Sequence, residues 1–269
     1  MQDWNPALYL RFANERTRPA AELLARVPSS LHSPARSLRI VDLGCGPGNS
    51  TELLVERFPD ADVLGIDNSE AMLETARKQL PQARFEAGDI ASWVPAEGEP
   101  APDLIYANAS IQWVGEHEAL IPRLFSLLAP GGVLAVQMPD NRQEPSHRNM
   151  REVARLSRFA SYIGDADKVR TDILPIGAYY DLLAAPVCDV ASVDVWHTIY
   201  QHPMESAAAI VQWLRGTGLK PFVEGLPAPL QADFLAEYER RIDAAYPERA
   251  DGKRLLAFPR LFMVAQRKS

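Results

Sequence analysis

The chain has 269 residues, of which 47% are hydrophobic, so it can bury a full core and is not disordered over long stretches. Its formal net charge of −7 argues against a nucleic-acid partner, because binding the phosphate backbone requires a broad basic face. Two cysteines make no disulfide framework, the start of the chain lacks a secretory pattern, and no apolar run reaches the ~18 residues that span a bilayer; we expect a cytoplasmic protein that does not enter a membrane.

The most strongly patterned stretch begins with the strand predicted over residues 38–43, in which Asp42 stands near the end. Glycines follow at 44, 46 and 48, with Cys45 between the first two. Glycine lets the backbone turn sharply and lets a ligand come close, because there is no Cβ in the way. A helix predicted over 50–58 then points its free N–H groups at that ligand. The third glycine comes one residue earlier than in the dinucleotide pattern GxGxxG, which favours a nucleoside without a pyrophosphate.

Strands and helices alternate after this loop, which is the pattern of a doubly wound α/β fold with a mostly parallel sheet. Further strands are predicted at 62–66, 83–86, 104–107 and 133–138, with helices at 69–79 and 117–128. The runs 190–200 and 261–267 are expected to form an antiparallel final pair, which gives seven strands, and helices are expected at 204–214 and 229–245. We expect a single domain, 1–269, with a cofactor-binding core at about 38–139 and covering elements at about 1–37 and 140–186.

Polar residues mark the carboxyl ends of the predicted strands, where an open parallel sheet binds its ligand. Asp67 ends the second strand 19 residues after Gly48, the place expected for a ribose-binding carboxylate. Asp89 follows the third strand, and Asn108 follows the fourth. Either acid alone is also explained as a helix cap or a loop residue. Their order and spacing together favour a ligand site.

The acid-ended strand, the GxGxG loop, Asp67 and Asp89 together resemble the class I S-adenosylmethionine-dependent methyltransferases. The LxPGG turn at 128–132, before the strand at 133–138, is similar to the same family. This resemblance implies S-adenosyl-L-methionine as cofactor, with Asp67 on the ribose, Asp89 near the adenine amino group and Ile90 covering the ring. The residues implied to contact the cofactor are Asp42, Gly44, Cys45, Gly46, Gly48, Asp67, Asn68, Asp89, Ile90 and Asn108.

The N-terminal stretch DWNPALYLRFANERTRPAAELL resembles the opening of the trans-aconitate methyltransferases, which esterify one carboxylate of a tricarboxylic acid. The matching positions are Trp4, Tyr9, Phe12, Arg16, Arg18 and Pro19, and the ANASIQW segment matches as well. The resemblance implies a small-molecule polycarboxylate substrate held by Arg16 and Arg18, with Tyr9, Gln112 and Trp113 shaping the reacting end. Tyr179, Tyr180, His197, Tyr200 and Arg215 are further candidates for the same cavity.

Methylation of a carboxylate needs no catalytic acid or base, because a carboxyl group with a pKa of ~4 is already ionised at neutral pH. The site needs arginines, because a guanidinium group can donate two parallel hydrogen bonds to one carboxylate. No metal site is predicted.

The segment 140–186 carries a basic run in which Arg151, Arg155 and Arg158 have the spacing of one helical face. This pattern favours a solvated face, and an anion-attracting lid is the alternative.

Other functions remain open at this point. A methyltransferase for a carrier-protein-bound carboxylate, of the malonyl-carrier type, shares the cofactor motifs and needs a basic docking patch. A base-modifying nucleic-acid methyltransferase is disfavoured, since Asn108-Ala109-Ser110-Ile111 is not its Asn/Asp-Pro-Pro-aromatic motif. A non-catalytic nucleoside-binding protein has no reason to keep both acids and the glycine loop.

Overall fold

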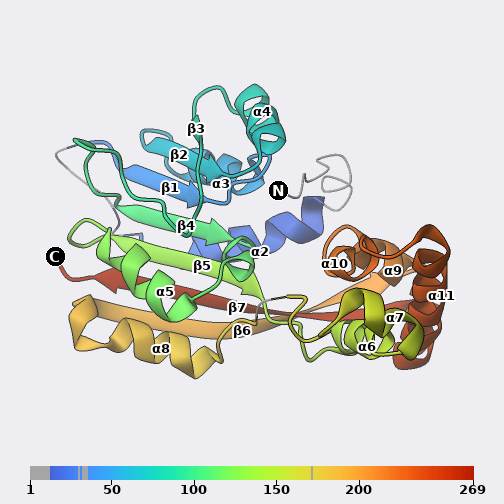
Figure 1. Cartoon of the computed structure of the whole chain (residues 1–269). Helices are drawn as coiled ribbons and strands as arrows, with labels where there is room; N and C mark the ends of the chain where they lie inside the picture. Colours follow the sequence, from blue (N-terminus) through green and yellow to red (C-terminus); the bar gives the residue numbers. More distant parts are fainter. Residues whose placement is uncertain (1–12, 30, 32–35, 171) are drawn as a thin grey trace. The chain divides into compact units, whose positions relative to one another are not determined.

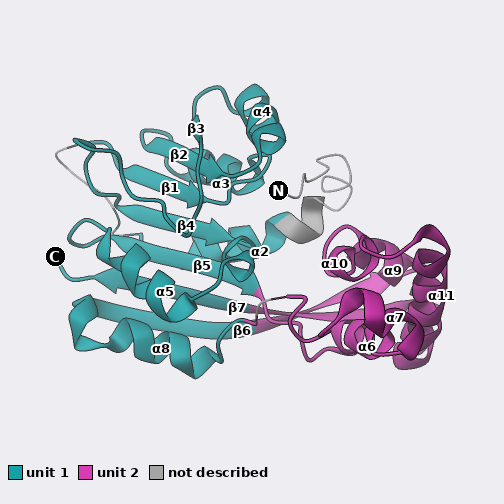
Figure 2. Ribbon diagram, in the orientation of Figure 1, with its two compact units in different colours: residues 1–138, 173–197, 261–269 teal, residues 139–172, 198–260 magenta. Residues whose placement is uncertain are grey.

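The computed structural model describes residues 13–29, 31, 36–170 and 172–269. Tyr9, with Trp4 and Phe12, lies outside these residues. The chain divides into two compact units, which Figure 2 distinguishes by colour. Unit 1 comprises residues 1–138, 173–197 and 261–269, and unit 2 comprises residues 139–172 and 198–260.

Seven strands form one sheet in the order β3-β2-β1-β4-β5-β7-β6. Their bounds are β1 Arg39–Leu43, β2 Asp62–Asp67, β3 Arg84–Ala87, β4 Leu104–Asn108, β5 Val133–Pro139, β6 Val190–Met204 and β7 Arg254–Arg267. The first five strands are parallel, and Asp42 of β1 pairs with Gly65 of β2 and Tyr106 of β4. β7 runs opposite to β5, since Arg267 N donates to Gly132 O at the start of β5 (Figure 1). The predicted seven-stranded, mostly parallel α/β sheet is confirmed, and its strand order reverses beside β1.

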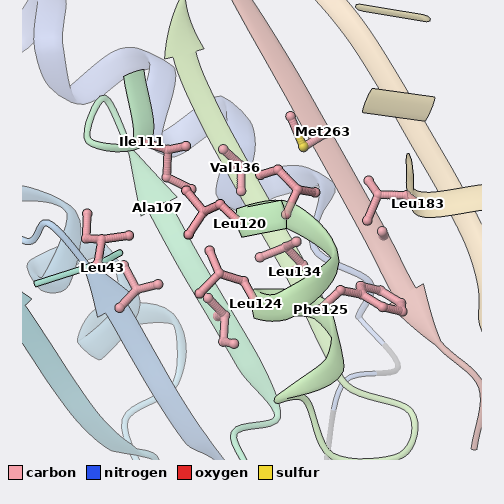
Figure 3. Close-up of a cluster of buried hydrophobic side chains, with 14 of the residues drawn as sticks. Leu43, Ala107, Ile111, Leu120, Leu124, Phe125, Leu134, Val136, Leu183 and Met263 are labelled. Carbon is pink, nitrogen blue, oxygen red and sulfur yellow. The ribbon is translucent and has the colours of Figure 1, made fainter. Parts of the chain in front are cut away.

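The core of unit 1 lies between the sheet and two helices, α5 His117–Ser126 and α8 Ile176–Ala184. Alternation along β4 explains which residues face it: Ile105 and Ala107 are buried in this cluster, whereas the Tyr106 hydroxyl donates to Ala20 O of α2 Ala13–Arg26 at 2.6 Å. Figure 3 shows Leu120, Leu124 and Phe125 of α5 within the cluster.

Two further helices of unit 1 follow the first two strands. α3 Asn49–Arg57 lies against α2, because Arg57 donates to the carbonyl oxygens of Leu24 and Val27 at 2.7 and 2.9 Å. α4 Glu70–Gln79 follows β2, and two short 3₁₀ helices occupy Ile111–Trp113 (η1) and Pro186–Cys188 (η2).

Unit 2 contains α6 Pro145–Ala154, α7 Ser157–Ile163, α9 Ala207–Arg215, α10 Lys220–Val223 and α11 Ala228–Ala245. α11 packs on α6 and α9, and its Phe234 ring meets Phe159 at a centroid distance of 5.1 Å. Across the described ranges, no helix is both long and apolar enough to cross a membrane.

The basic run of unit 2 does not form the predicted helical face. α6 ends at Ala154 and α7 begins at Ser157, because Leu156 adopts an extended conformation (φ −62°, ψ 138°). Arg151 is only 8% exposed, and it donates to the carbonyl oxygens of Arg142 and His147. The solvated interpretation is therefore wrong for Arg151, whose role in the fold is to satisfy buried carbonyls.

The start of one predicted helix also shifts. The helix expected at 204–214 begins at Ala207, because Ser206 Oγ accepts from Ala209 N at 3.1 Å and caps it, while β6 continues to Met204. Helix α2 begins at Ala13 and contains Pro19.

Candidate functional site

The glycine loop joins β1 to α3 and is tied to the end of β2. Gly44 N and Cys45 N donate to Ile66 O at 2.7 and 3.0 Å. Gly44 has φ +74°, and a Cβ added to it would lie 2.2 Å from Ser110 Cβ and 3.3 Å from Ile90 Cδ1. The segments that follow β1, β3 and β4 therefore meet at this glycine, and nothing larger than glycine fits there.

Gly46 lies at the middle of the glycine loop, a position that we call the crest of the loop. Gly46 has φ +54°, and a Cβ added to it would meet no atom of the described residues within 4 Å. Its N–H donates to Asp67 Oδ2 at 2.9 Å, and Asp67 Oδ1 accepts from Ser69 N at 2.9 Å. A carboxylate oxygen accepts more than one hydrogen bond, so Asp67 shapes the loop and still has acceptor capacity for a ligand.

Asp42 is fully buried at the end of β1. Its Oδ2 accepts from Ser50 Oγ and Thr51 Oγ1, both at 2.7 Å, whereas its Oδ1 has no hydrogen-bond partner among the described residues. Burial, and to a smaller extent the nearby carboxylate of Asp67, raises the pKa of Asp42 to about 6, against the two hydroxyls that lower it. A donor that reached Oδ1 would favour the ionised form.

The turn after β3 presents an exposed carboxylate. Asp89 Oδ1 accepts from Ala91 N at 2.9 Å, which orders the turn and leaves Oδ2 available. Arg123 of α5 secures this turn, because its guanidinium donates to Ile90 O and Trp93 O, both at 2.7 Å. Sequence reasoning missed Arg123, whose one signal was a charge between the apolar positions of α5.

The turn after β4 is strained and extensively hydrogen-bonded. Ala109 has φ +53°, a left-handed conformation that a non-glycine residue rarely adopts. Its N–H donates to Gln137 O at 2.8 Å, and its carbonyl oxygen accepts from Gln112 Nε2 at 2.6 Å. Ser110 Oγ donates to Leu43 O at 2.6 Å, and Trp113 is 41% exposed at the end of η1. Strain of ~1–3 kcal/mol held by such contacts is typical of functional turns.

Several buried acceptors in these segments have no hydrogen-bond partner among the described residues. They are Asp42 Oδ1, Asn49 Oδ1, Asn108 Oδ1 and Gln112 Oε1. A buried acceptor left unpaired costs ~1–3 kcal/mol, so the site favours a ligand that brings hydrogen-bond donors.

The remaining predicted site residues lie as follows. Cys45 packs its buried thiol against Leu73, Ala76, Leu80 and Phe85, and burial raises its pKa. Asn68 is exposed beside Asp67, and Gly48 makes the left-handed turn that begins α3.

Arg18 is exposed and pairs with Glu22 at 2.7 Å, while Arg16 lies in α2 with its side chain outside the described residues. Tyr179, a candidate for the cavity, is instead fully buried in the core of unit 1. Within the described residues no group of His, Cys, Asp and Glu suits a metal ion.

A family model described as a methyltransferase domain matches residues 40–132, the part that carries these turns. Over its full length the chain is 74% identical to a trans-aconitate 2-methyltransferase of Delftia acidovorans and 68% identical to one of Variovorax paradoxus, each of which is also covered completely. A third relative with the same name, from Yersinia pseudotuberculosis, is 54% identical over 98% of both chains.

Solved structures agree on the fold. The YcgJ protein of Bacillus subtilis superposes with a TM-score of 0.59 at 14% identity, covering 94% of this chain and 99% of that one. A geranyl diphosphate methyltransferase in complex with SAM gives a TM-score of 0.51 at 16% identity, covering 97% of this chain and 88% of that one.

Proposed function

This chain belongs to the trans-aconitate 2-methyltransferase family, and we propose from that premise that it esterifies one carboxylate of trans-aconitate with a methyl group from S-adenosylmethionine. The observation in the site that best supports the proposal is the set of buried acceptors that lack a hydrogen-bond partner among the described residues, beside the glycine loop. S-adenosylmethionine carries the donors that such a set requires: an ammonium group, two ribose hydroxyls and an adenine amino group.

Each turn has a proposed part in holding the cofactor. Asp42 Oδ1 and Asn108 Oδ1 are the acceptors for the ammonium group, and Asp67 is the acceptor for the ribose hydroxyls. Asp89 Oδ2 receives the adenine amino group, with Ile90 against the ring. The crest at Gly46 gives the ligand its close approach to the backbone.

The chemistry asks little of the protein beyond orientation and the exclusion of water. S-adenosylmethionine supplies the methyl group from a positively charged sulfonium, whose charge is lost in the reaction, so a dry pocket favours transfer. Arg16 and Arg18 hold the carboxylates that do not react, and Tyr9 and Trp113 shape the reacting end. Gln112 Nε2 donates one N–H to Ala109 O, and its second N–H can donate to a carboxylate oxygen of the substrate.

A substrate panel tests this function. We expect methyl transfer to trans-aconitate with a higher kcat/KM than to cis-aconitate, citrate, isocitrate or malonyl-carrier protein, measured by mass spectrometry of the ester. A carrier-bound malonyl group turned over faster than every free acid would contradict the proposal and favour the carrier-protein alternative.

Substrate recognition is expected to depend on the arginines of α2. Arg16→Ala or Arg18→Ala should lower kcat/KM for trans-aconitate by ~10–100-fold, as when a bidentate anchor is lost, with little change in cofactor affinity. Losing the exposed Arg18–Glu22 pair costs at most ~1 kcal/mol, so the Arg18 variant stays folded. Arg155→Ala, an exposed arginine of unit 2, is the matched control. Full activity in both α2 variants, with loss in the control, would move substrate recognition to unit 2.

Cofactor affinity should depend on pH through Asp42. The pKa of this carboxyl in the folded chain is about 6, above its ordinary 3.8, and an ammonium group at Oδ1 favours the ionised form. Below pH 6 the free protein must therefore release a proton to bind the cofactor, and the Kd should rise up to ~10-fold per pH unit. Between pH 6.5 and 7.5 it should be nearly constant. Calorimetric titration from pH 5 to 7.5 measures this, and Asp42→Asn should remove the slope. An equal slope in that variant would place the titrating group elsewhere.

A further inference from the structure

A buried histidine supports the turn that carries Gln112 and Trp113. His117, the first residue of α5, is 3% exposed, and its Nε2 lies 3.0 Å from Ile111 O. A carbonyl oxygen only accepts, so Nε2 carries a proton, and in the neutral imidazole Nδ1 is then an acceptor. The Tyr179 hydroxyl lies 2.5 Å from Nδ1 and therefore donates to it. The hydrogen-bonded pair of His117 and Tyr179 holds Ile111, the first residue of η1. Gln112 and Trp113 are the next two residues of the chain.

The Tyr179 hydroxyl also joins two further segments of unit 1. It accepts from Leu174 N at 3.0 Å and lies 3.8 Å from Met138 Sδ. Met138 is the last residue of unit 1 before the segment 139–172, which belongs to unit 2, and Leu174 is the second residue after that segment. One oxygen atom thus ties η1 to the end of β5 and to the segment that leads into α8.

The surroundings of this network are apolar. Apolar side chains would fill the same space, so packing alone does not explain an imidazole and a phenol there. Tyr179 belongs to the same cluster as Ile111, Leu120 and Leu183. Polar groups in such a cluster stabilise the fold only when each is hydrogen-bonded, and they then fix one arrangement. The arrangement fixed here begins at Ala109, whose left-handed backbone stores strain that its neighbours must hold.

We propose that His117 and Tyr179 are positioning residues of methyl transfer, which set the place of Gln112 and Trp113 through the carbonyl of Ile111. Both side chains are buried in the core, so we expect them to act through Ile111 and not by direct contact with the ligands. The inference rests on the proposed function for the roles of Gln112 and Trp113, and it adds the device that orients them.

Three variants and a control test the proposal. Tyr179→Phe keeps the ring and removes the donor to His117, and His117→Leu removes both hydrogen bonds. Both should lower kcat for trans-aconitate by ~10–100-fold, the scale of a misplaced reacting group, while the Kd for S-adenosylmethionine changes less than about threefold. In His117→Gln the amide donates to Ile111 O and accepts from Tyr179, so it should recover most of the lost kcat. Tyr238→Phe, which removes a buried hydroxyl of unit 2 bonded to Ser146 O, controls for stability alone and should keep the kcat of the unmodified chain.

The outcomes separate a positioning role from a packing role. An unchanged kcat in a folded Tyr179→Phe or His117→Leu, or a His117→Gln as slow as His117→Leu, would overturn the proposal. Equal losses of kcat in Tyr238→Phe would also overturn it. The unmodified chain is assayed beside the variants: should it leave trans-aconitate unmethylated, the proposed function fails by itself, and the ratios are measured with the acceptor that the panel identifies.

Discussion

Gly46→Ala is expected to weaken S-adenosylmethionine binding by ~100-fold or more, about 2.7 kcal/mol, while the chain stays folded. The added Cβ meets no atom of the described residues within 4 Å, and on the proposed function the cofactor takes the space that it fills. The left-handed φ of +54° adds only ~1–2 kcal/mol of strain to the fold. Calorimetric titration gives the affinity, and thermal unfolding shows whether the variant is folded.

Gly44→Ala is the matched comparison within the same loop. Its Cβ would lie 2.2 Å from Ser110 Cβ, so the contact between the β1 and β4 turns cannot form and both stability and binding should be lost. The two alanines thus separate a glycine needed by the ligand from one needed by the fold. A Gly46→Ala chain that binds the cofactor normally would show that the ligand does not approach the crest of the loop.

The sequence alone was sufficient for the central sheet because its signals are local. The apolar run before Asp42, the glycines after it and the Pro130-Gly131-Gly132 turn mark where strands begin and end, and β1 to β5 lie within one residue of the predicted ranges. Strand ends of a parallel sheet share one edge, so the predicted strand ends were enough to place Asp67 and Asp89 on the edge where we propose the ligand site.

The supporting contacts were not predictable, because they join residues far apart in the chain. Arg123 reaches carbonyls 30 and 33 residues away, and Tyr179 reaches His117 across 62 residues. An aromatic residue on an amphipathic helix has the same sequence pattern whether it faces a cavity or the core, so the pattern alone does not distinguish the predicted cavity position of Tyr179 from its position in the core. Arg151 likewise has the spacing of a solvated face, and only the tertiary fold supplies the carbonyls that draw it inside.

Asp67→Ala is expected to raise the Kd for S-adenosylmethionine by ~30–100-fold, because a hydrogen bond to a charged acceptor is worth ~1.5–3 kcal/mol and the ribose loses its carboxylate. The loss has a second source, since Asp67 also accepts from Gly46 N and Ser69 N and so holds the loop in place.

Asp67→Asn separates these two contributions, because one side-chain oxygen remains to hold Gly46 N while the charge and an acceptor are lost. Its Kd should fall between those of the unmodified chain and the alanine variant. Asp62→Ala, at the opposite end of the same strand and paired with Arg84 on the surface, is the control and should leave the Kd unchanged. Unaltered affinity in Asp67→Ala would place the ribose away from β2, and an equal loss in Asp62→Ala would mean that the strand itself had been damaged.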